Sequence, residues 1–193
     1  MQDPTDCSII SYLRFIKSNG AVYKQSKWNS ENKLMDTFNH KLPKAIEKKL
    51  DKLSIGDQYK VYPRSGLSGI WNELIYIAFL DKKLSRSING YTPSLGVYPI
   101  IMASPDCQNF YLMYMVAAGS KTPRELTKYV SEVQQLLELD DYATDVSKLN
   151  LGKDVKKYKL ATICYIELDV DNYVSDSEFI ADLQRFLLSI QHF

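Results

Sequence analysis

Residues Lys60 to Met102 read KVYPRSGLSGIWNELIYIAFLDKKLSRSINGYTPSLGVYPIIM and carry the clearest signals for the fold. This stretch begins with a loop rich in glycine and serine at 64–69 and continues with two apolar segments at 74–80 and 97–102. Short apolar runs bounded by glycine, proline and asparagine are typical of buried strands. Loops that carry glycines, hydroxyls and basic residues between strands often form binding sites, although ordinary hairpin loops have the same composition.

Patterns typical of helices and strands continue on both sides of this stretch. Apolar residues at helical spacing predict helices at 5–18, 30–42, 43–53, 122–137 and 175–190. Alternation and β-forming residues predict strands at 58–62, 74–80, 97–103, 109–117 and 160–168. Gly20 is expected to end the first helix, Pro43 to restart the chain and Pro63 to end the first strand. Because hairpins dominate, we expect an α+β fold, with a mixed, mainly antiparallel sheet of about five strands and helices packed on one side.

Length and composition limit the kind of protein that this chain forms. With 193 residues, 45% of them hydrophobic, the chain is long enough for one ordinary core. We therefore expect a single domain over 1–193, with its core at about 50–190 and a helical N-terminal extension at 1–50. Three widely spaced cysteines and two histidines disfavour a zinc site and a disulfide framework. The sequence contains neither a signal-peptide pattern nor an apolar run of membrane length, so we expect a cytoplasmic protein without a cofactor.

Charge is distributed unevenly along the chain, although the net charge is only +1. Residues 1–100 contain 15 Lys and Arg against 9 Asp and Glu, whereas residues 101–193 contain 9 against 14. Basic residues are therefore concentrated around the 64–69 loop, where a polyanion can approach. A second basic group surrounds Tyr158 and comprises Lys156, Lys157 and Lys159. The alternative is that these charges lie on solvated faces without a partner.

Sequence motifs for catalysis are lacking. The segment Gly119-Ser-Lys-Thr122 follows a predicted strand and precedes a predicted helix, but it lacks the glycines that a phosphate-binding loop requires. No constellation of nucleophile and base can be named, so a binding module is favoured over an enzyme. Two alternatives remain open. One is a protein-interaction or assembly module, and the other is a small metal-dependent nuclease that uses Glu73, Asp81 and Lys83.

Six segments from residue 65 onward form an ordered pattern. The pattern comprises a glycine-rich loop, an apolar strand ending in an acid, a Gly-aliphatic-Tyr-Pro strand, a strand with a small-residue turn, an aromatic strand and an Asp-Leu helix. The segments are SGLSGIW (65–71), IYIAFLD (75–81), GVYPIIM (96–102), 110–119, 160–168 and FIADL (179–183). Over about residues 50–190 the sequence thereby resembles the McrB-like N-terminal DNA-binding domain of methyl-directed (type IV) restriction systems.

The resemblance implies an α+β domain that reads a modified cytosine, expected to be methylated, by flipping the base out of the duplex into an aromatic-lined pocket. One wall of that pocket falls on Tyr76, the contact to the methyl group on Met102, and a later tyrosine on Tyr158. The opposing aromatic wall falls on Ser68, which has no ring to stack. Trp71 either replaces that wall or packs in the core.

The remaining expected contacts are to the DNA backbone and grooves. Basic side chains are expected to contact phosphates, namely Lys60, Arg64, Lys82, Lys83 and Arg86. The 65–69 backbone is expected to enter one groove and 87–91 the other, with Ser65, Gly66, Ser68, Gly69 and Asn89 as contacts. The resemblance places the family's minor-groove loop tyrosine on Tyr98. It also implies two partners beside modified double-stranded DNA, an AAA+ GTPase motor and a nuclease subunit. The chain itself is then no enzyme and contacts no membrane.

Overall fold

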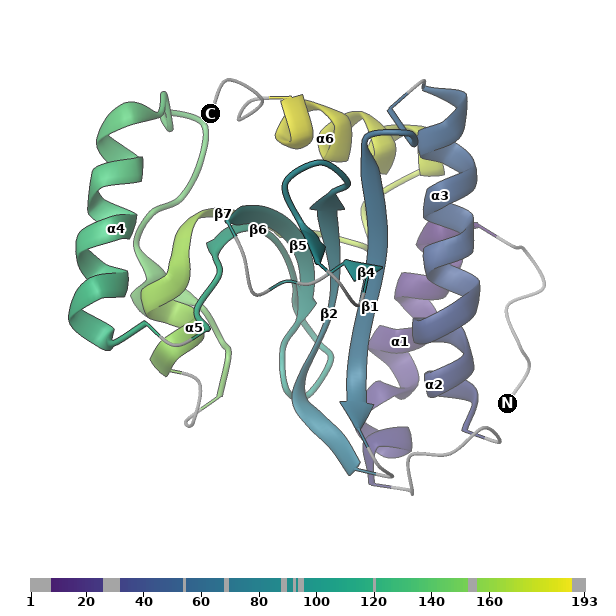
Figure 1. The fold of residues 1–193 in the computed structure, drawn as a ribbon. Helices are drawn as coiled ribbons and strands as arrows, with labels where there is room; N and C mark the ends of the chain where they lie inside the picture. Colours follow the sequence, from purple (N-terminus) through teal and green to yellow (C-terminus); the bar gives the residue numbers. More distant parts are fainter. Residues whose placement is uncertain are drawn as a thin grey trace.

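The computed structural model describes residues 8–25, 32–53, 55–67, 70–87, 90–91, 93, 96–119, 121–152 and 156–188. Within these ranges, five strands form one antiparallel sheet in the order β1-β2-β5-β6-β7 (Figure 1). They are β1 (Tyr59–Leu67), β2 (Ile70–Asp81), β5 (Val97–Ala103), β6 (Phe110–Val116) and β7 (Thr162–Leu168). Two short strands, β3 (Arg86–Ser87) and β4 (Gly90–Tyr91), pair with each other. The α+β class and the sheet of about five strands are confirmed.

The hairpin at the centre of the sheet forms as predicted, whereas the edge strand β1 is longer than predicted. β5 and β6 meet at a turn in which the Asn109 N–H donates a hydrogen bond to the Ser104 hydroxyl at 2.9 Å. β1, by contrast, continues beyond Pro63, which lies opposite Ile77 of β2. An edge strand tolerates a residue without an N–H, because that residue removes no bond needed by an inner ladder. The expectation that Pro63 ends the strand is therefore wrong.

The pairing register assigns alternate residues to two faces of the sheet. Arg64, Tyr76, Met102 and Tyr111 are successive cross-strand partners from β1 to β6, so their side chains lie on one face. We call this face the tyrosine face, because it carries Tyr62, Tyr76, Tyr98, Tyr111 and Tyr165. The opposite face, which carries Tyr114, is called the helix-covered face.

The helix-covered face packs against helices from both ends of the chain (Figure 1). These elements are α1 (Ile9–Lys24), α2 (Lys33–Asp36), η1 (Thr37–Lys41), α3 (Leu42–Lys52) and α6 (Asp176–Leu188). The Tyr114 hydroxyl donates a hydrogen bond at 2.9 Å to the carbonyl of Phe186, in the last turn of α6, where carbonyls lack partners within the helix. Buried side chains of these helices and of the sheet belong to one hydrophobic core. Among the described residues, no helix combines the length and apolarity needed to cross a membrane.

Two helix boundaries differ from expectation. Gly20 lies inside α1, which continues beyond it. A Cβ at Gly20 would lie 2.6 Å from the Sγ of Cys107, so glycine is needed there for close packing rather than for ending the helix. Pro43 does not restart the chain, because α2, η1 and α3 follow one another without a break. In η1, a π-helical turn, the Leu42 N–H donates to the carbonyl of Thr37, and this wider turn accommodates a proline that has no N–H.

The later part of the chain covers the tyrosine face over β6 and β7. It comprises α4 (Pro123–Leu136), which begins with a capping box, η2 (Val146–Lys148) and α5 (Lys156–Ala161). The Asn150 N–H donates a hydrogen bond to the Tyr111 hydroxyl at 3.3 Å, and the Tyr165 hydroxyl donates one to the Asp145 carbonyl at 3.0 Å. The ring of Tyr158 in α5 contacts that of Tyr76, so α5 also lies on the tyrosine face, opposite the helices of the helix-covered face.

Candidate nucleic-acid interface

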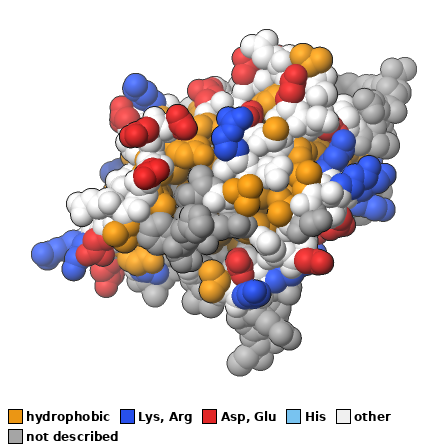
Figure 2. Space-filling view, turned by 90° about the horizontal axis from the view of Figure 1, so that it is seen from above, with side chains coloured by type: hydrophobic (Ala, Val, Ile, Leu, Met, Phe, Trp, Pro, Cys, Tyr) orange, Lys and Arg blue, Asp and Glu red, His pale blue; other side chains and the backbone are white. Residues whose placement is uncertain are grey.

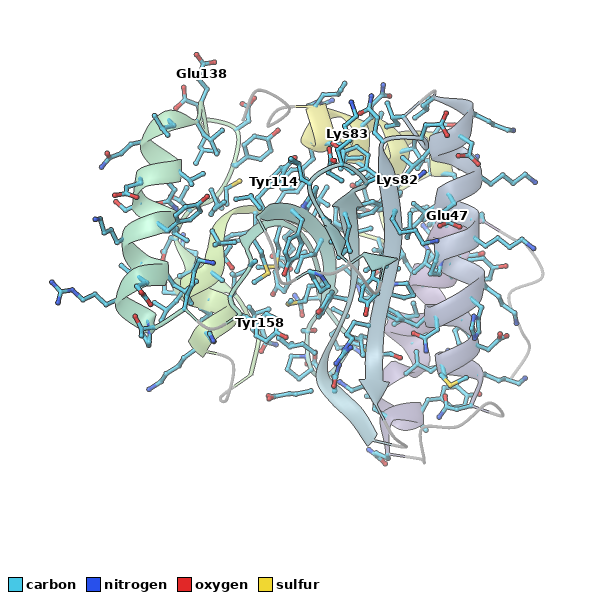
Figure 3. The ribbon with its side chains drawn as sticks, in the orientation of Figure 1. Glu47, Lys82, Lys83, Tyr114, Glu138 and Tyr158 are labelled. Carbon is cyan, nitrogen blue, oxygen red and sulfur yellow. The ribbon has the colours of Figure 1, made fainter. Side chains whose placement is uncertain are left out.

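Three tyrosines from different elements meet on the tyrosine face. Tyr76 lies in the middle of β2, Tyr98 near the start of β5, and Tyr158 on α5 beside the sheet (Figure 3). The ring centres of Tyr76 and Tyr158 are 6.4 Å apart, and their planes are inclined by 58°. Tyr76 and Tyr98 are each 8% exposed, whereas Tyr158 is half-buried and is the most accessible of the three. We call these three residues the tyrosine cluster.

The hydroxyls of the tyrosine cluster stay protonated at neutral pH. Burial raises the pKa of Tyr76 to about 12, and the neighbouring Tyr158 phenol adds to this rise. Burial likewise raises the pKa of Tyr98 and of Tyr158 above the ordinary value of a phenol. The Arg64 guanidinium opposes the rise in pKa at Tyr76 and Tyr158, as expected for a cation close to both phenols. Each hydroxyl can therefore donate a hydrogen bond.

Arg64 supplies a positive charge next to the tyrosine cluster. It lies directly opposite Tyr76 in the β1–β2 ladder and is half-buried. In the part of the chain that the structure describes, no carboxylate forms an ion pair with its guanidinium. A half-buried arginine without a carboxylate partner, beside neutral hydroxyl donors, favours an anionic ligand. The guanidinium fork matches the oxygens of a phosphate.

Three residues of the expected base pocket, Tyr76, Met102 and Tyr158, lie close together among the described residues, and Met102 is inaccessible to solvent. Met102 is the cross-strand partner of Tyr76, and the ring of Tyr158 contacts that of Tyr76. Met102 is fully buried, so a ligand reaches it only when a neighbouring side chain moves. Tyr98, which the resemblance assigned to a loop, lies instead within β5 because that strand pairs with β6 along its length. The side chain of Trp71 lies outside the described residues.

Part of the first loop that was expected to enter a DNA groove belongs to strand β1. Residues 65–67 belong to β1, and Gly66 pairs with Trp71 after a shift in register. Ser65 is 2% exposed, and its hydroxyl donates a hydrogen bond to the Asn39 side chain at 2.9 Å, so this hydroxyl already has a partner inside the protein. The loop expected at 64–69 is therefore shorter than the sequence indicated. Ser68, Gly69 and Asn89 lie outside the described residues, as does the side chain of Arg86.

Two of the lysines expected to contact phosphates are engaged within the protein. The Lys60 ammonium lies 3.3 Å from the Glu47 carboxylate of α3. The Lys82 ammonium donates a hydrogen bond to the Gly56 carbonyl at 3.0 Å. Lys83 is exposed. An ion pair between exposed side chains contributes little to stability, so Lys60 can exchange Glu47 for a phosphate at small cost.

Lys82 and Lys83 are distant from the tyrosine cluster. Lys82 follows Tyr76 by six residues, which corresponds to about 20 Å along an extended chain. Figure 3 shows both lysines at the end of the sheet away from Tyr158. Figure 2 views the molecule from that end and shows acidic and basic side chains intermingled around hydrophobic ones. Any contact of these two lysines with DNA therefore belongs to a different part of the footprint from the tyrosine cluster.

The fold separates the residues of the nuclease alternative. Glu73 and Asp81 lie eight residues apart on the single strand β2, or about 26 Å. Carboxylates that share a metal ion must approach it to about 2 Å each. Asp81 instead accepts hydrogen bonds from the N–H groups of Lys83 and Leu84. Among the residues with described positions, no group of three or more His, Cys, Asp and Glu is arranged to hold a metal. Glu73, Asp81 and Lys83 therefore do not form one site.

The sequence did not predict the helix α5, although it showed the basic residues around Tyr158. Six residues with a lysine-rich composition give a weak helical signal, and propensity alone rarely forms so short a helix. Packing against its neighbours holds α5 in place, since the Lys157 ammonium donates to the Gly119 carbonyl at 2.6 Å and the Thr162 hydroxyl to the Tyr158 carbonyl at 2.8 Å. This helix brings Tyr158 to Tyr76 across 82 positions of sequence.

Comparison with known proteins adds one finding. The family model described as "MrcB-like, N-terminal domain" matches residues 20–193, which is nearly the whole chain. Neither the curated proteins nor the solved structures yielded a match.

Proposed function

The chain belongs to the MrcB-like N-terminal domain family, and on this premise we propose that it is the DNA-recognition domain of a modification-dependent restriction or defence system. The family indicates a DNA-binding domain of a restriction system. Our finer proposal is that the domain reads a modified cytosine, expected to be methylated, which it takes out of the duplex. The observation that carries this proposal is the tyrosine cluster with Arg64 beside it, which has no carboxylate partner among the described residues.

The energetics of base flipping are compatible with this site. Unstacking and unpairing one base costs a few kcal/mol, and stacking on an aromatic side chain returns about 1–3 kcal/mol per base. A base between two rings needs two van der Waals contacts of about 3.5 Å each. The Tyr76 and Tyr158 ring centres are only 6.4 Å apart and the rings are tilted, so the base displaces Tyr158 from Tyr76 or pushes α5 outward. Binding is therefore coupled to a movement of the Tyr158 side chain or of α5.

Each neighbouring group has a role in the proposed complex. The face of Tyr76 stacks on the base, and protonated tyrosine hydroxyls donate to its polar edge. Met102, a flexible apolar side chain, offers the methyl group a nonpolar contact. Arg64 holds a phosphate of the same strand, which fixes the position of the nucleotide without reading its identity.

The partners and the remaining contacts follow from the family. We propose that an AAA+ GTPase motor, fused or associated, and a nuclease subunit act with this domain, and that the chain alone cuts no DNA. Lys60, Lys82, Lys83 and Arg86 would contact phosphates away from the tyrosine cluster, with Ser68, Gly69 and Asn89 near the grooves.

Fluorescence anisotropy on matched duplexes tests the proposal. The duplexes are unmodified or carry 5-methylcytosine, 5-hydroxymethylcytosine or N6-methyladenine, each at two salt concentrations. We expect the tightest binding to one of the cytosine modifications. No binding to any duplex at low salt would refute the DNA-recognition function and favour the protein-interaction alternative. Salt-dependent binding of equal strength to all the duplexes would refute only the proposal that the domain recognises a modified base.

A substitution at Tyr76 tests the pocket separately. Because Tyr76 is 8% exposed, truncation to alanine would leave a large cavity, and Tyr76→Leu removes the aromatic face with less loss of volume. Loss of one stacking contact of about 1–3 kcal/mol predicts about 5- to 150-fold weaker binding to the preferred duplex and unchanged binding to plain DNA. Tyr165→Leu is the matched control, since Tyr165 is 6% exposed on the same face but lies on β7. Equal losses on both duplexes for Tyr76→Leu would contradict the pocket.

A further inference from the structure

The helix α5 carries cations on its accessible side. Lys156 and Lys159 are three residues apart in a helix and therefore lie on the same side of it. Tyr158, between them in sequence, points to the sheet and contacts Tyr76. Lys156 is exposed and Lys159 is half-buried. The cations of α5 thus flank, in sequence, the most accessible member of the tyrosine cluster.

Neither of these lysines is neutralised within the described part of the protein. The salt bridges found there involve other residues, and of the α5 lysines only Lys157 has a hydrogen-bond partner, the Gly119 carbonyl. Arg64 of β1 lies opposite Tyr76, whose ring contacts that of Tyr158, and it likewise has no carboxylate partner among the described residues. Within the described residues, cations without a carboxylate partner therefore lie near Tyr158 on two elements, α5 and β1.

We propose that α5 is a phosphate-contact helix and that a nucleic-acid strand crosses the protein between α5 and β1, with Lys156 and Lys159 on one side of Tyr158 and Arg64 on the other. This inference rests on the proposed DNA-recognition function and names which surface meets the backbone. It differs from the sequence-based assignment, which placed phosphate contacts on β1 and on the segment after β2 and none on α5.

Chemistry favours a nucleic acid over an acidic protein at this surface. Cations next to aromatic rings are the combination with which proteins bind exposed nucleotides, because the cations follow the backbone and the rings stack on bases. An acidic peptide offers carboxylates to the lysines but no flat ring system to Tyr158. The proximity of Arg64 to two phenols suits a phosphate in the same way, since guanidinium and hydroxyl groups donate to its oxygens together.

A pair of double variants tests the inference in the intact chain. Lys156→Gln with Lys159→Gln removes two charges from α5 while it preserves helix-forming side chains. Lys44→Gln with Lys48→Gln removes two charges from exposed positions of α3, on the helix-covered face, and is the matched control. Binding to the duplex that wild type prefers is measured by anisotropy across a series of salt concentrations. Far-UV circular dichroism verifies that both variants are folded.

We expect the α5 variant to bind several-fold more weakly and to lower the slope of log K against log salt by about 1.8, since each phosphate contact contributes about 0.9. The α3 control should keep the slope of wild type. Identical slopes for the two variants, with wild type still binding DNA, would overturn the role of α5 and leave the proposed function intact. A wild type that binds no duplex would overturn both. The assignment of a nucleic acid to this surface would be overturned if wild type bound polyglutamate as tightly as DNA and the α5 substitutions abolished that binding.

Discussion

The contact between Gly20 and Cys107 makes a prediction whose sign depends on the tertiary structure. Gly20 lies inside α1, where replacement by alanine ordinarily stabilises a helix by about 1 kcal/mol. Here the new Cβ would lie 2.6 Å from the Sγ and 2.7 Å from the Cβ of Cys107. Overpacking of this kind costs about 1–3 kcal/mol, and the upper end applies because a Cβ cannot rotate away. We expect Gly20→Ala to lower the free energy of unfolding by about 2 kcal/mol.

Removal of the opposing side chain should reverse that sign. Cys107 adopts φ +60°, a left-handed conformation that glycine accepts without the cost of about 1–2 kcal/mol paid by other residues. Cys107→Gly deletes both clashing atoms and relieves this strain, and the methyl group of Gly20→Ala then occupies part of the vacated space. In the Cys107→Gly background we therefore expect Gly20→Ala to raise stability by about 1 kcal/mol. The coupling between the two substitutions is about 3 kcal/mol.

Urea denaturation of the four proteins, followed by circular dichroism, measures this coupling. Independent substitutions add within about 0.3–0.5 kcal/mol, so a coupling below that limit would refute the close contact between α1 and the β5–β6 turn. Gly96→Ala combined with Cys107→Gly is the control, because a Cβ at Gly96 meets nothing within 4 Å. That pair should be additive.

Three further predictions concern tyrosines and glycines. Burial raises the pKa of Tyr76 to about 12, whereas an unfolded phenol ionises near 10. The neutral, buried Tyr76 therefore contributes about 3 kcal/mol to the free energy of unfolding below pH 10, and this contribution is lost as the pH rises through 12. In chemical denaturation at increasing pH, Tyr76→Phe should lose less stability than wild type, and an equal loss would contradict the raised pKa of Tyr76. Tyr114→Phe removes the hydrogen bond to the Phe186 carbonyl and should lower the free energy of unfolding by about 1–2 kcal/mol in urea titrations, whereas no loss would show that the carbonyl finds another partner. Gly152→Ala and Gly96→Ala each place a Cβ on a residue of positive φ, which strains the backbone. A Cβ at Gly152 would also lie 3.1 Å from the Cγ of Pro105, whereas one at Gly96 meets nothing within 4 Å. Thermal unfolding should therefore show a larger loss of stability for Gly152→Ala, and equal losses would contradict the close approach at Gly152.

Much of the fold was predictable because its signals are local. The strand at 97–103 was predicted with the bounds that the structure shows, since a short apolar run ends at a turn whose side chains satisfy the backbone. The capping box of Thr122 and Glu125 begins α4 as expected. Both features depend on residues within a few positions of each other. The family resemblance was likewise readable from ordered segments of the chain, and the family match over residues 20–193 confirms it.

Three of the errors share one cause, which is that the effect of a proline or glycine depends on its surroundings in the fold. Gly20 was expected to end a helix and Pro63 to end a strand, as each does when only neighbouring residues are considered. In the fold, Gly20 is required by Cys107, 87 positions away, and Pro63 is tolerated because β1 is an edge strand of the sheet that the described residues form. Pro43 is likewise absorbed by the π-helical turn that precedes it.

Local sequence signals were sufficient to predict the class of fold, the hairpin at its centre and the aromatic and basic residues proposed to meet DNA. Which of these residues lie together depends on the packing of the folded chain. Periodicity shows which residues are buried but not which distant segments pack against one another, because that choice minimises the free energy of the whole core. Thus Tyr158, Tyr76 and Arg64 meet at one point, while Lys82 and Lys83, closer to Tyr76 in sequence than Tyr158 is, lie at the far end of an extended strand.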